Sequence, residues 1–232
     1  MNILITRPLI DSEDLMGKLF SLGHKIVHIP TLKISAANAR PVDAKKYDAF
    51  IFTSANAIRN LKLNNLDNSK ICFCVGSITE KIVRQKGYNN TISAGGTVNA
   101  LKNIILNSDQ IDKKKSIAYF CGDYISSNLD VELKNDGFQI DKIINYTSEK
   151  ITDLNDKNNK IIKNHPPDII LIYSKRSAES FIDIVKKYSL NGLMTESRVL
   201  CISEKVLGVF KNLGWKKLEV FQPGEELEKL KV

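Results

Sequence analysis

The chain alternates short apolar runs with polar turns and amphipathic stretches, and the clearest example begins at residues 48–52. This run is apolar and rich in aromatic and branched side chains, as buried parallel strands are. Thr53, Ser54 and Asn56 follow it directly, and a helical pattern continues to Leu61. Because Ser or Thr at the start of a helix accepts hydrogen bonds from its first free N–H groups, the pattern predicts a strand, a capped turn and a helix.

The turn after this strand is a candidate ligand site. Free N–H groups at a helix start attract anions, and the helix dipole adds to that attraction. In open α/β sheets, ligands collect at the carboxyl ends of the strands, where such turns lie. We therefore interpret residues 50–59 as one wall of a ligand-binding cleft.

Similar strand–turn–helix units occur along the whole chain. Further strands are expected at residues 2–5, 25–29, 71–75, 117–121, 138–144, 168–172 and 199–203. Helices are expected at about residues 12–22 and 98–107, and just before Gly87, Gly137 and Gly214. Two polar stretches, residues 32–46 and 145–167, are interpreted as connecting segments.

The second half of the chain repeats the landmarks of the first half in the same order. The matching landmarks are Gly23 and Gly137, 114 positions apart, Ser54 and Ser174, 120 apart, and Gly87 and Gly214, 127 apart. Single strand–turn–helix units recur in any α/β protein, but three units in register favour an internal duplication. The repeat therefore predicts two similar α/β domains with parallel sheets that face one cleft.

Composition narrows the class of protein. The 232 residues suffice for one large or two small domains, and 43% are hydrophobic, so a core can be buried. No apolar run approaches the roughly 20 residues of a membrane helix, and residues 1–7 resemble a first strand rather than a signal peptide. The four cysteines lie in apolar, strand-like contexts without a C-x-x-C pair, as reduced core thiols of a cytoplasmic protein do. Because the three histidines do not cluster with them, we expect no metal site.

The formal net charge of +8 allows two interpretations. Lysines can simply cover solvated surfaces, or they can attract an acidic partner such as nucleic acid or a polycarboxylate. Zinc-finger spacing and an aromatic RNA-binding motif are absent, and the lysines are scattered, which disfavours nucleic acid. The chain also lacks both common phosphate-binding loops, G-x-G-x-x-G and G-x-x-x-x-G-K-[ST], which disfavours a nucleotide-using enzyme. Residues 95–97 form only a weak anion-binding motif.

Several short motifs appear together in a characteristic order. They are residues 4–8 (LITRP), 52–59 (FTSANAIR), 75–79 (VGSIT), Gly137, 145–147 (NYT), 173–174 (YS) and 201–204 (CISE). In order and spacing this set resembles the uroporphyrinogen-III synthase family, the cyclising enzymes of tetrapyrrole synthesis. The resemblance covers nearly the whole chain, although no single motif is diagnostic.

The resemblance implies a fold of two flavodoxin-like α/β domains joined by two crossing strands, with a cleft between them. Residues 1–34 and 149–232 would form one discontinuous domain and residues 37–146 the other, with connectors near 32–46 and 145–167. The implied substrate is hydroxymethylbilane, a linear tetrapyrrole polycarboxylate. The implied reaction removes the terminal hydroxyl, inverts the last pyrrole ring through a spiro intermediate and closes uroporphyrinogen III. We expect a monomer without cofactor, metal, nucleic-acid partner or membrane contact.

Two residues are candidates for catalysis. Tyr146 matches the family's tyrosine beside the second crossing strand, and a phenol can donate a proton to a departing hydroxyl. Without the resemblance, Tyr146 would be an ordinary strand aromatic. Thr79 would serve as a helix cap that also reaches a substrate carboxylate, and the alternative is a plain cap.

The candidate substrate-binding residues lie at the predicted turns. They are Arg7, Thr53, Ser54, Asn56, Ser77, Tyr173, Ser174 and Ser203, with additional helix starts at Thr79 and Thr97. For Ser54 and Ser174 the alternative is capping alone, and for Arg7 it is a solvated surface position. Asn56 either donates its amide to the substrate or stabilises the turn. The pair at residues 175–176 either helps to hold carboxylates or lies in a solvated loop.

One residue departs from the family pattern. Many members have Thr or Ser where this chain has Val206, which cannot donate a side-chain hydrogen bond. Either Ser203 and the free backbone bind that carboxylate, or the position matters less than the pattern suggests. The departure favours an alternative function, a non-catalytic tetrapyrrole- or anion-binding module with the same fold, whereas the presence of Tyr146 and Thr79 argues against that alternative.

Overall fold

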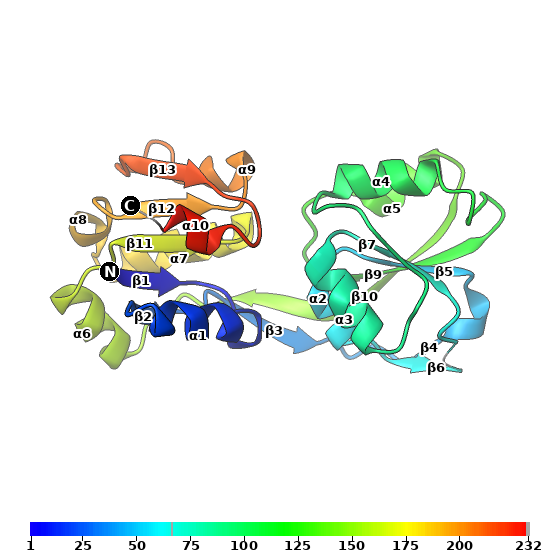
Figure 1. The fold of residues 1–232 in the computed structure, drawn as a ribbon, viewed down its shortest axis with the longest axis horizontal. Helices are drawn as coiled ribbons and strands as arrows, with labels where there is room; N and C mark the ends of the chain where they lie inside the picture. The colour runs from blue at the N-terminus through cyan, green and yellow to red at the C-terminus, as the bar shows by residue number, and fades with distance from the viewer. Residues whose placement is uncertain (66, 231–232) are drawn as a thin grey trace. The chain divides into compact units, whose positions relative to one another are not determined.

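The computed structural model describes residues 1–65 and 67–230, which form two compact domains. The first domain contains Met1–Lys33 and the chain from Glu149 onward, and the second contains Ile34–Ser148. The chain leaves the first domain along β3 (Leu32–Ala36) and returns along β10 (Gln139–Lys150), as Figure 1 shows.

The first domain has a five-stranded sheet in the order β13-β12-β11-β1-β2, with every neighbouring pair parallel. Its strands are β1 (Asn2–Ile5), β2 (Lys25–His28), β11 (Ile169–Ile172), β12 (Arg198–Cys201) and β13 (Lys217–Val220). Its helices are η1 (Leu9–Asp11), α1 (Glu13–Ser21), α6 (Asp156–Asn164), α7 (Lys175–Lys187), α8 (Asn191–Met194), α9 (Glu204–Leu207) and α10 (Glu226–Lys229).

Both faces of this sheet are covered, which explains why its central strands are continuously apolar. Leu4 and Ile170 pack in one cluster with residues of α7 and α9, such as Phe181. Ile3 and Leu171, their strand neighbours, pack in a second cluster with Leu19 of α1 and with the C-terminal segment. The side chains of each strand therefore alternate between two cores.

The second domain has a sheet in the order β3-β10-β9-β5-β7-β8, parallel from β10 to β8. Its remaining strands are β5 (Ala49–Phe52), β7 (Ile71–Cys74), β8 (Thr91–Ser93) and β9 (Ser116–Gly122), with the small pair β4 (Val42–Asp43) and β6 (Leu63–Asn64). Its helices are η2 (Ala44–Lys46), α2 (Ala55–Arg59), α3 (Ser77–Gln85), α4 (Val98–Leu106) and α5 (Leu129–Asn135). Two core clusters again cover its faces, one with α4 and α5 and the other with α2 and α3.

Three of the four repeated glycines, Gly23, Gly87 and Gly137, end helices. Gly23 follows α1 with a φ of +80°, and Gly137 follows α5 with a φ of +94°. This left-handed conformation is easily adopted only by glycine and lets the chain turn from the helix into the next strand. The predicted role of Gly23 and Gly137 is confirmed. The helix predicted just before Gly214 is shorter than expected, because α9 ends at Leu207 and turns lead from it to Gly214.

The two stretches interpreted as connectors contain more regular structure than the sequence indicated. Residues 32–46 include β3, β4 and η2, and the strand predicted at 138–144 continues to Lys150. Residues 156–164 form α6, because Asn155 caps it by accepting from the Asn158 N–H at 2.8 Å and Ile162 is buried in the first core. Many polar residues in these elements obscured their periodicity.

The four cysteines are buried in the strands as free thiols, as predicted. Burial raises the pKa of the Cys121 thiol to about 11, so this thiol is neutral and unreactive at physiological pH. Within residues 1–65 and 67–230, no helix combines the length and apolar character needed to cross a membrane.

Candidate functional site

Three predicted turns lie at the same edge of the first domain's sheet. Arg7 follows β1, Tyr173 and Ser174 follow β11, and Ser203 follows β12. Because β1, β11 and β12 are adjacent and parallel, their carboxyl ends meet at one edge. We call these residues the first-domain edge.

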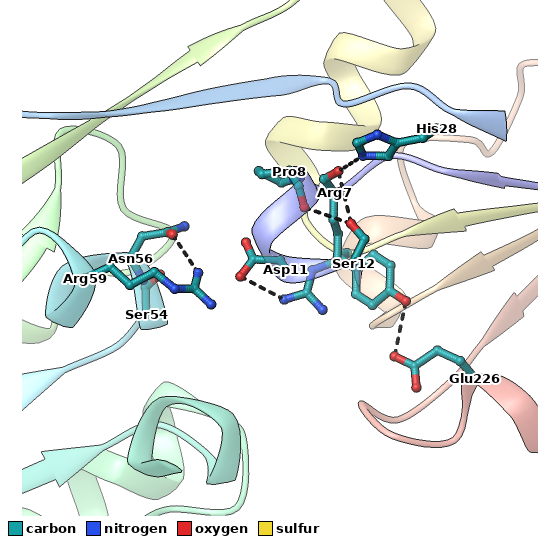
Figure 2. A network of polar contacts seen from close by, with 10 residues as sticks. Arg7, Pro8, Asp11, Ser12, His28, Ser54, Asn56, Arg59 and Glu226 are labelled. Carbon is teal, nitrogen blue, oxygen red and sulfur yellow. Dashed lines mark hydrogen bonds and ion pairs between the residues drawn. The ribbon is translucent and has the colours of Figure 1, made fainter. Parts of the chain in front are cut away.

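Arg7 lies on an aromatic platform at this edge. Its guanidinium carbon is 4.4 Å from the centre of the Tyr173 ring, and its Nη2 is 3.9 Å from Asp11 Oδ1. Figure 2 shows the bracing of its backbone, where Ser12 Oγ donates to the Pro8 carbonyl at 2.8 Å and His28 Nε2 lies 2.8 Å from the Arg7 carbonyl oxygen. Cation–π contact and the braced loop hold the guanidinium in place, so Arg7 is more ordered than a solvated surface arginine.

The hydroxyl of Tyr173 is occupied within the protein. It donates to Glu226 Oε1 at 3.2 Å, and Glu226 Oε2 accepts from the Gly224 N–H at 2.8 Å. Burial and the Glu226 charge raise the pKa of Tyr173 far above its usual value, which keeps the phenol protonated as the donor. Tyr173 therefore supports Arg7 with its ring, and Glu226, at only 8% exposure, is a site residue that the sequence analysis missed.

We expect Glu226→Gln to lower the free energy of unfolding by about 1–3 kcal/mol. The amide would turn one of the two buried acceptor oxygens into a donor, leaving either Tyr173 or Gly224 unsatisfied. Denaturant unfolding measures the change. Glu228→Gln removes the same charge from an exposed position of α10 and should change stability by less than about 0.5 kcal/mol. Equal stabilities of the two variants would contradict the role given to Glu226.

Ser174 and Ser203 are helix caps, as predicted. Ser174 Oγ accepts from the Ser177 N–H at 3.0 Å, and Ser203 Oγ accepts from the Val206 N–H at 3.4 Å. The α7 helix has 13 residues and α9 has 4, so only α7 has a substantial dipole to offer an anion.

Val206, the residue that departs from the family pattern, lies in the core of the first domain. Its side chain is 4% exposed and packs in the first-domain cluster that contains Phe181, while its backbone N–H bonds to Ser203. A valine fits this apolar environment without an unsatisfied hydroxyl. The structure thus gives Val206 a packing role.

A second set of residues lies at the carboxyl ends of the second domain's strands. Thr53 and Ser54 follow β5, Ser77 follows β7, and Tyr146 on β10 pairs with Gly122 at the end of β9. The strands β10, β9, β5 and β7 are consecutive neighbours. We call these residues the second-domain edge.

Tyr146 packs directly on Gly122. A Cβ atom at Gly122 would lie 2.7 Å from Cε2 and Cζ of Tyr146 and 3.0 Å from its hydroxyl oxygen, so only glycine leaves room for the ring. Tyr146 is 9% exposed and belongs to the core cluster with Phe52 and Phe120. The ring is therefore fixed by packing, with its hydroxyl over the end of β9.

Thr53 contacts a second tyrosine at this edge, which the sequence analysis missed. Thr53 Oγ1 is 3.0 Å from the hydroxyl of Tyr119, and either oxygen can be the donor. Burial raises the pKa of Tyr119 far above its usual value, and the nearby Tyr146 adds to the shift. Tyr119 thus stays neutral, and its hydroxyl restrains the Thr53 turn.

Ser54 and Asn56 both stabilise the turn that begins α2. Ser54 Oγ accepts from the Asn56 N–H at 3.1 Å, which confirms the predicted cap. Asn56 Oδ1 accepts from Arg59 Nη1 at 3.1 Å, as drawn in Figure 2. The side chain of Asn56 therefore stabilises its own helix through its carbonyl oxygen, one of its two predicted roles, and the other role concerns its amide N–H groups.

The prediction that Thr79 caps a helix is wrong. Gly76 occupies the N-cap position of α3 in an extended conformation without a side-chain cap, and Thr79 is a buried residue inside the helix. Glycine is well tolerated at N-caps, so the helix begins earlier than the hydroxyl pattern suggested. Ser77, the first helical residue, is exposed. Thr97 does cap α4, accepting from the Ala100 N–H at 3.1 Å.

Among residues 1–65 and 67–230, no group of three or more His, Cys, Asp or Glu side chains comes together in a way that could hold a metal ion. The ring of His28 instead braces Arg7.

The fold and the two edges define a class of protein. Each edge is the carboxyl end of an open, mostly parallel sheet with hydroxyls and capped turns, and the first edge also has an arginine. This combination is typical of two-domain α/β proteins that bind anionic small molecules. The sequence profile described as uroporphyrinogen-III synthase HemD matches residues 13–224. The chain therefore belongs to the uroporphyrinogen-III synthase family, cyclising lyases of tetrapyrrole biosynthesis.

Solved structures share the fold at low sequence identity. A uroporphyrinogen-III synthetase from Helicobacter pylori is 16% identical, with 98% of this chain and 97% of that one covered and a TM-score of 0.64. A mutant uroporphyrinogen III synthase from Thermus thermophilus is 13% identical, with 99% and 95% covered and a TM-score of 0.59. No curated protein sequence matches significantly. These likenesses confirm the predicted α/β fold with open, mostly parallel sheets.

Proposed function

We propose that this chain removes the terminal hydroxyl of hydroxymethylbilane, inverts the last pyrrole ring and closes uroporphyrinogen III. The family match over residues 13–224 is the observation that carries the proposal. The packing of Tyr146 over Gly122 adds a fixed phenol at a sheet edge, where α/β enzymes bind ligands.

In this proposal Tyr146 is the proton donor. Its hydroxyl proton goes to the departing hydroxyl, the C–O bond breaks, and water leaves with the electron pair. The pyrrole nitrogens of the substrate stabilise the electrophile, so the chemistry requires little beyond a proton donor and correct placement of the two substrate ends. The proton released when the macrocycle forms restores the phenol.

The substrate's eight carboxylates bind to the remaining edge residues in this proposal. Arg7 contributes a charge-assisted contact, and the cap at Ser174 leads into the long helix α7 with its free N–H groups. The net charge of +8 would speed the approach of a polyanion. Weaker contacts to the carboxylates are proposed for Thr53, Ser54, Ser77 and Ser203. Thr79 is buried within α3, so it is proposed to hold this helix in place rather than to cap it.

Product analysis tests the proposed reaction. Purified protein is supplied with hydroxymethylbilane, and the oxidised products are separated into type I and type III isomers. Spontaneous closure gives the uninverted type I ring, so we expect a catalytic excess of type III. Type I alone from folded protein would overturn the proposal and favour the non-catalytic tetrapyrrole-binding module.

We further propose a cytoplasmic monomer that does not use nucleic acid. The four buried free thiols fit a reducing compartment. Light scattering would reveal a larger assembly, and nucleic-acid binding with a steep salt dependence would contradict the proposed partner class.

A further inference from the structure

The pairing of β9 with β10 is irregular at the residue proposed to deliver the proton. The strands pair residue by residue from Ser116 to Cys121, and the register then shifts between Ile144 and Tyr146. Tyr146 pairs with Gly122, the last residue of β9. The regular ladder therefore ends where Tyr146 must be held, so other groups must fix this part of β10.

The backbone and the side chain of Asp123 hold this part of β10. Its backbone N–H donates to the Tyr146 carbonyl at 3.1 Å, and its Oδ1 accepts from the Ser148 N–H at 2.9 Å. The same oxygen accepts from the Tyr124 N–H at 2.9 Å, which fixes the carboxylate within its own turn. Asp123 thus bonds to β10 on both sides of Thr147 and continues the ladder beyond the end of β9.

We propose that Asp123 is a positioning residue for Tyr146. The proposal rests on the proposed function, because it assumes that the Tyr146 hydroxyl donates the proton. The carboxylate replaces the carbonyl that a further β9 residue would offer to Ser148. It holds the strand so that the Tyr146 ring stays on Gly122, where small displacements of the phenol would impair proton transfer.

Asp123 positions Tyr146 through its hydrogen bonds and not through its charge. The Asp123 side chain is exposed at an edge proposed to bind an anion, where a negative charge brings no attraction. An asparagine keeps the acceptor oxygen without the charge, whereas an alanine leaves the Ser148 N–H without this partner. The two substitutions therefore separate geometry from electrostatics.

The test is a double-mutant cycle on kcat for type III product. We expect Asp123→Ala to lower kcat about 10- to 100-fold with little change in KM, and Asp123→Asn to retain most of the activity. In a Tyr146→Phe background, Asp123→Ala should cause no further loss, because its effect passes through the missing hydroxyl. Asp109→Ala, which removes an exposed charge elsewhere in the second domain, is the control.

Three results would overturn the proposal. Wild-type kcat in Asp123→Ala would show that the bonds do not matter, and an additive loss in the double variant would indicate a general structural role. A loss in Asp123→Asn equal to that in Asp123→Ala would assign the role to charge. If Asp123→Ala does not fold, Asp123→Glu is measured instead. Its longer side chain displaces the carboxylate, so the same loss of kcat is expected. Wild-type activity of Tyr146→Phe itself would instead refute the assigned proton donor.

Discussion

Tyr146→Phe is expected to lower kcat for type III product about 10²- to 10⁴-fold, the usual contribution of a general acid. Phenylalanine keeps the ring that packs on Gly122 and in the core with Phe52 and Phe120, so the fold should be preserved. The substitution removes the hydroxyl group that would donate the proton. Because binding of the carboxylates does not depend on this proton, KM should change little. Steady-state kinetics with separation of the two isomers measures both effects.

Tyr88→Phe is the matched control for this substitution. Tyr88 belongs to the same core cluster, and its buried hydroxyl has no hydrogen-bond partner among residues 1–65 and 67–230. Removing that hydroxyl should leave activity unchanged and should not destabilise the domain. A similar loss of activity in both variants would indicate a packing effect, and full activity of Tyr146→Phe would transfer the proton-donor role to another group.

The local elements could be predicted because their signals are local. The apolar run before Ser54 and the similar run before Ser174 both form buried strands that lead into capped helices. In each case the strand, the cap and the start of the helix follow one another directly, at residues 49–55 and 169–175, so composition and periodicity suffice. Thr79 shows the limit of this logic, since its hydroxyl suggested a helix start, yet the N-cap is Gly76, three residues earlier.

The contacts that complete the two edges could not be predicted, because they join residues far apart in sequence. The hydrogen bond from Tyr173 to Glu226 spans 53 positions, and that between Thr53 and Tyr119 spans 66. Glu226 follows a Pro-Gly turn near the end of the chain, where no periodic pattern marks it as buried. Such contacts depend on strand order, which a single sequence without its fold does not specify.

The fold also changes the meaning of two residues that the family pattern singled out. Val206 had suggested a missing hydrogen bond to substrate, yet its side chain lies in the core. Tyr173 was a candidate substrate-binding residue, yet its hydroxyl donates to Glu226. In both cases the sequence predicted a position near the edge of the sheet, whereas the direction of the side chain depended on packing.

Gly122→Ala should impair activity as strongly as the loss of the Tyr146 hydroxyl, although Gly122 has no functional group. The added Cβ would lie 2.7 Å from two ring carbons of Tyr146, closer than real Cβ contacts allow. Either the ring or the end of β9 must move, and overpacking of this kind lowers the free energy of unfolding by about 1–3 kcal/mol. Because the phenol is displaced, we expect kcat for type III product to fall about 100-fold or more.

The control for this prediction is Gly17→Ala in α1, where a new Cβ meets nothing within 4 Å. Alanine is the better helix former, so this variant should be up to about 1 kcal/mol more stable and fully active. Thermal or denaturant unfolding and isomer-resolved kinetics are measured for both variants. Wild-type stability and activity of Gly122→Ala would mean that the ring of Tyr146 moves without penalty, which is incompatible with a proton donor held in place by packing on Gly122.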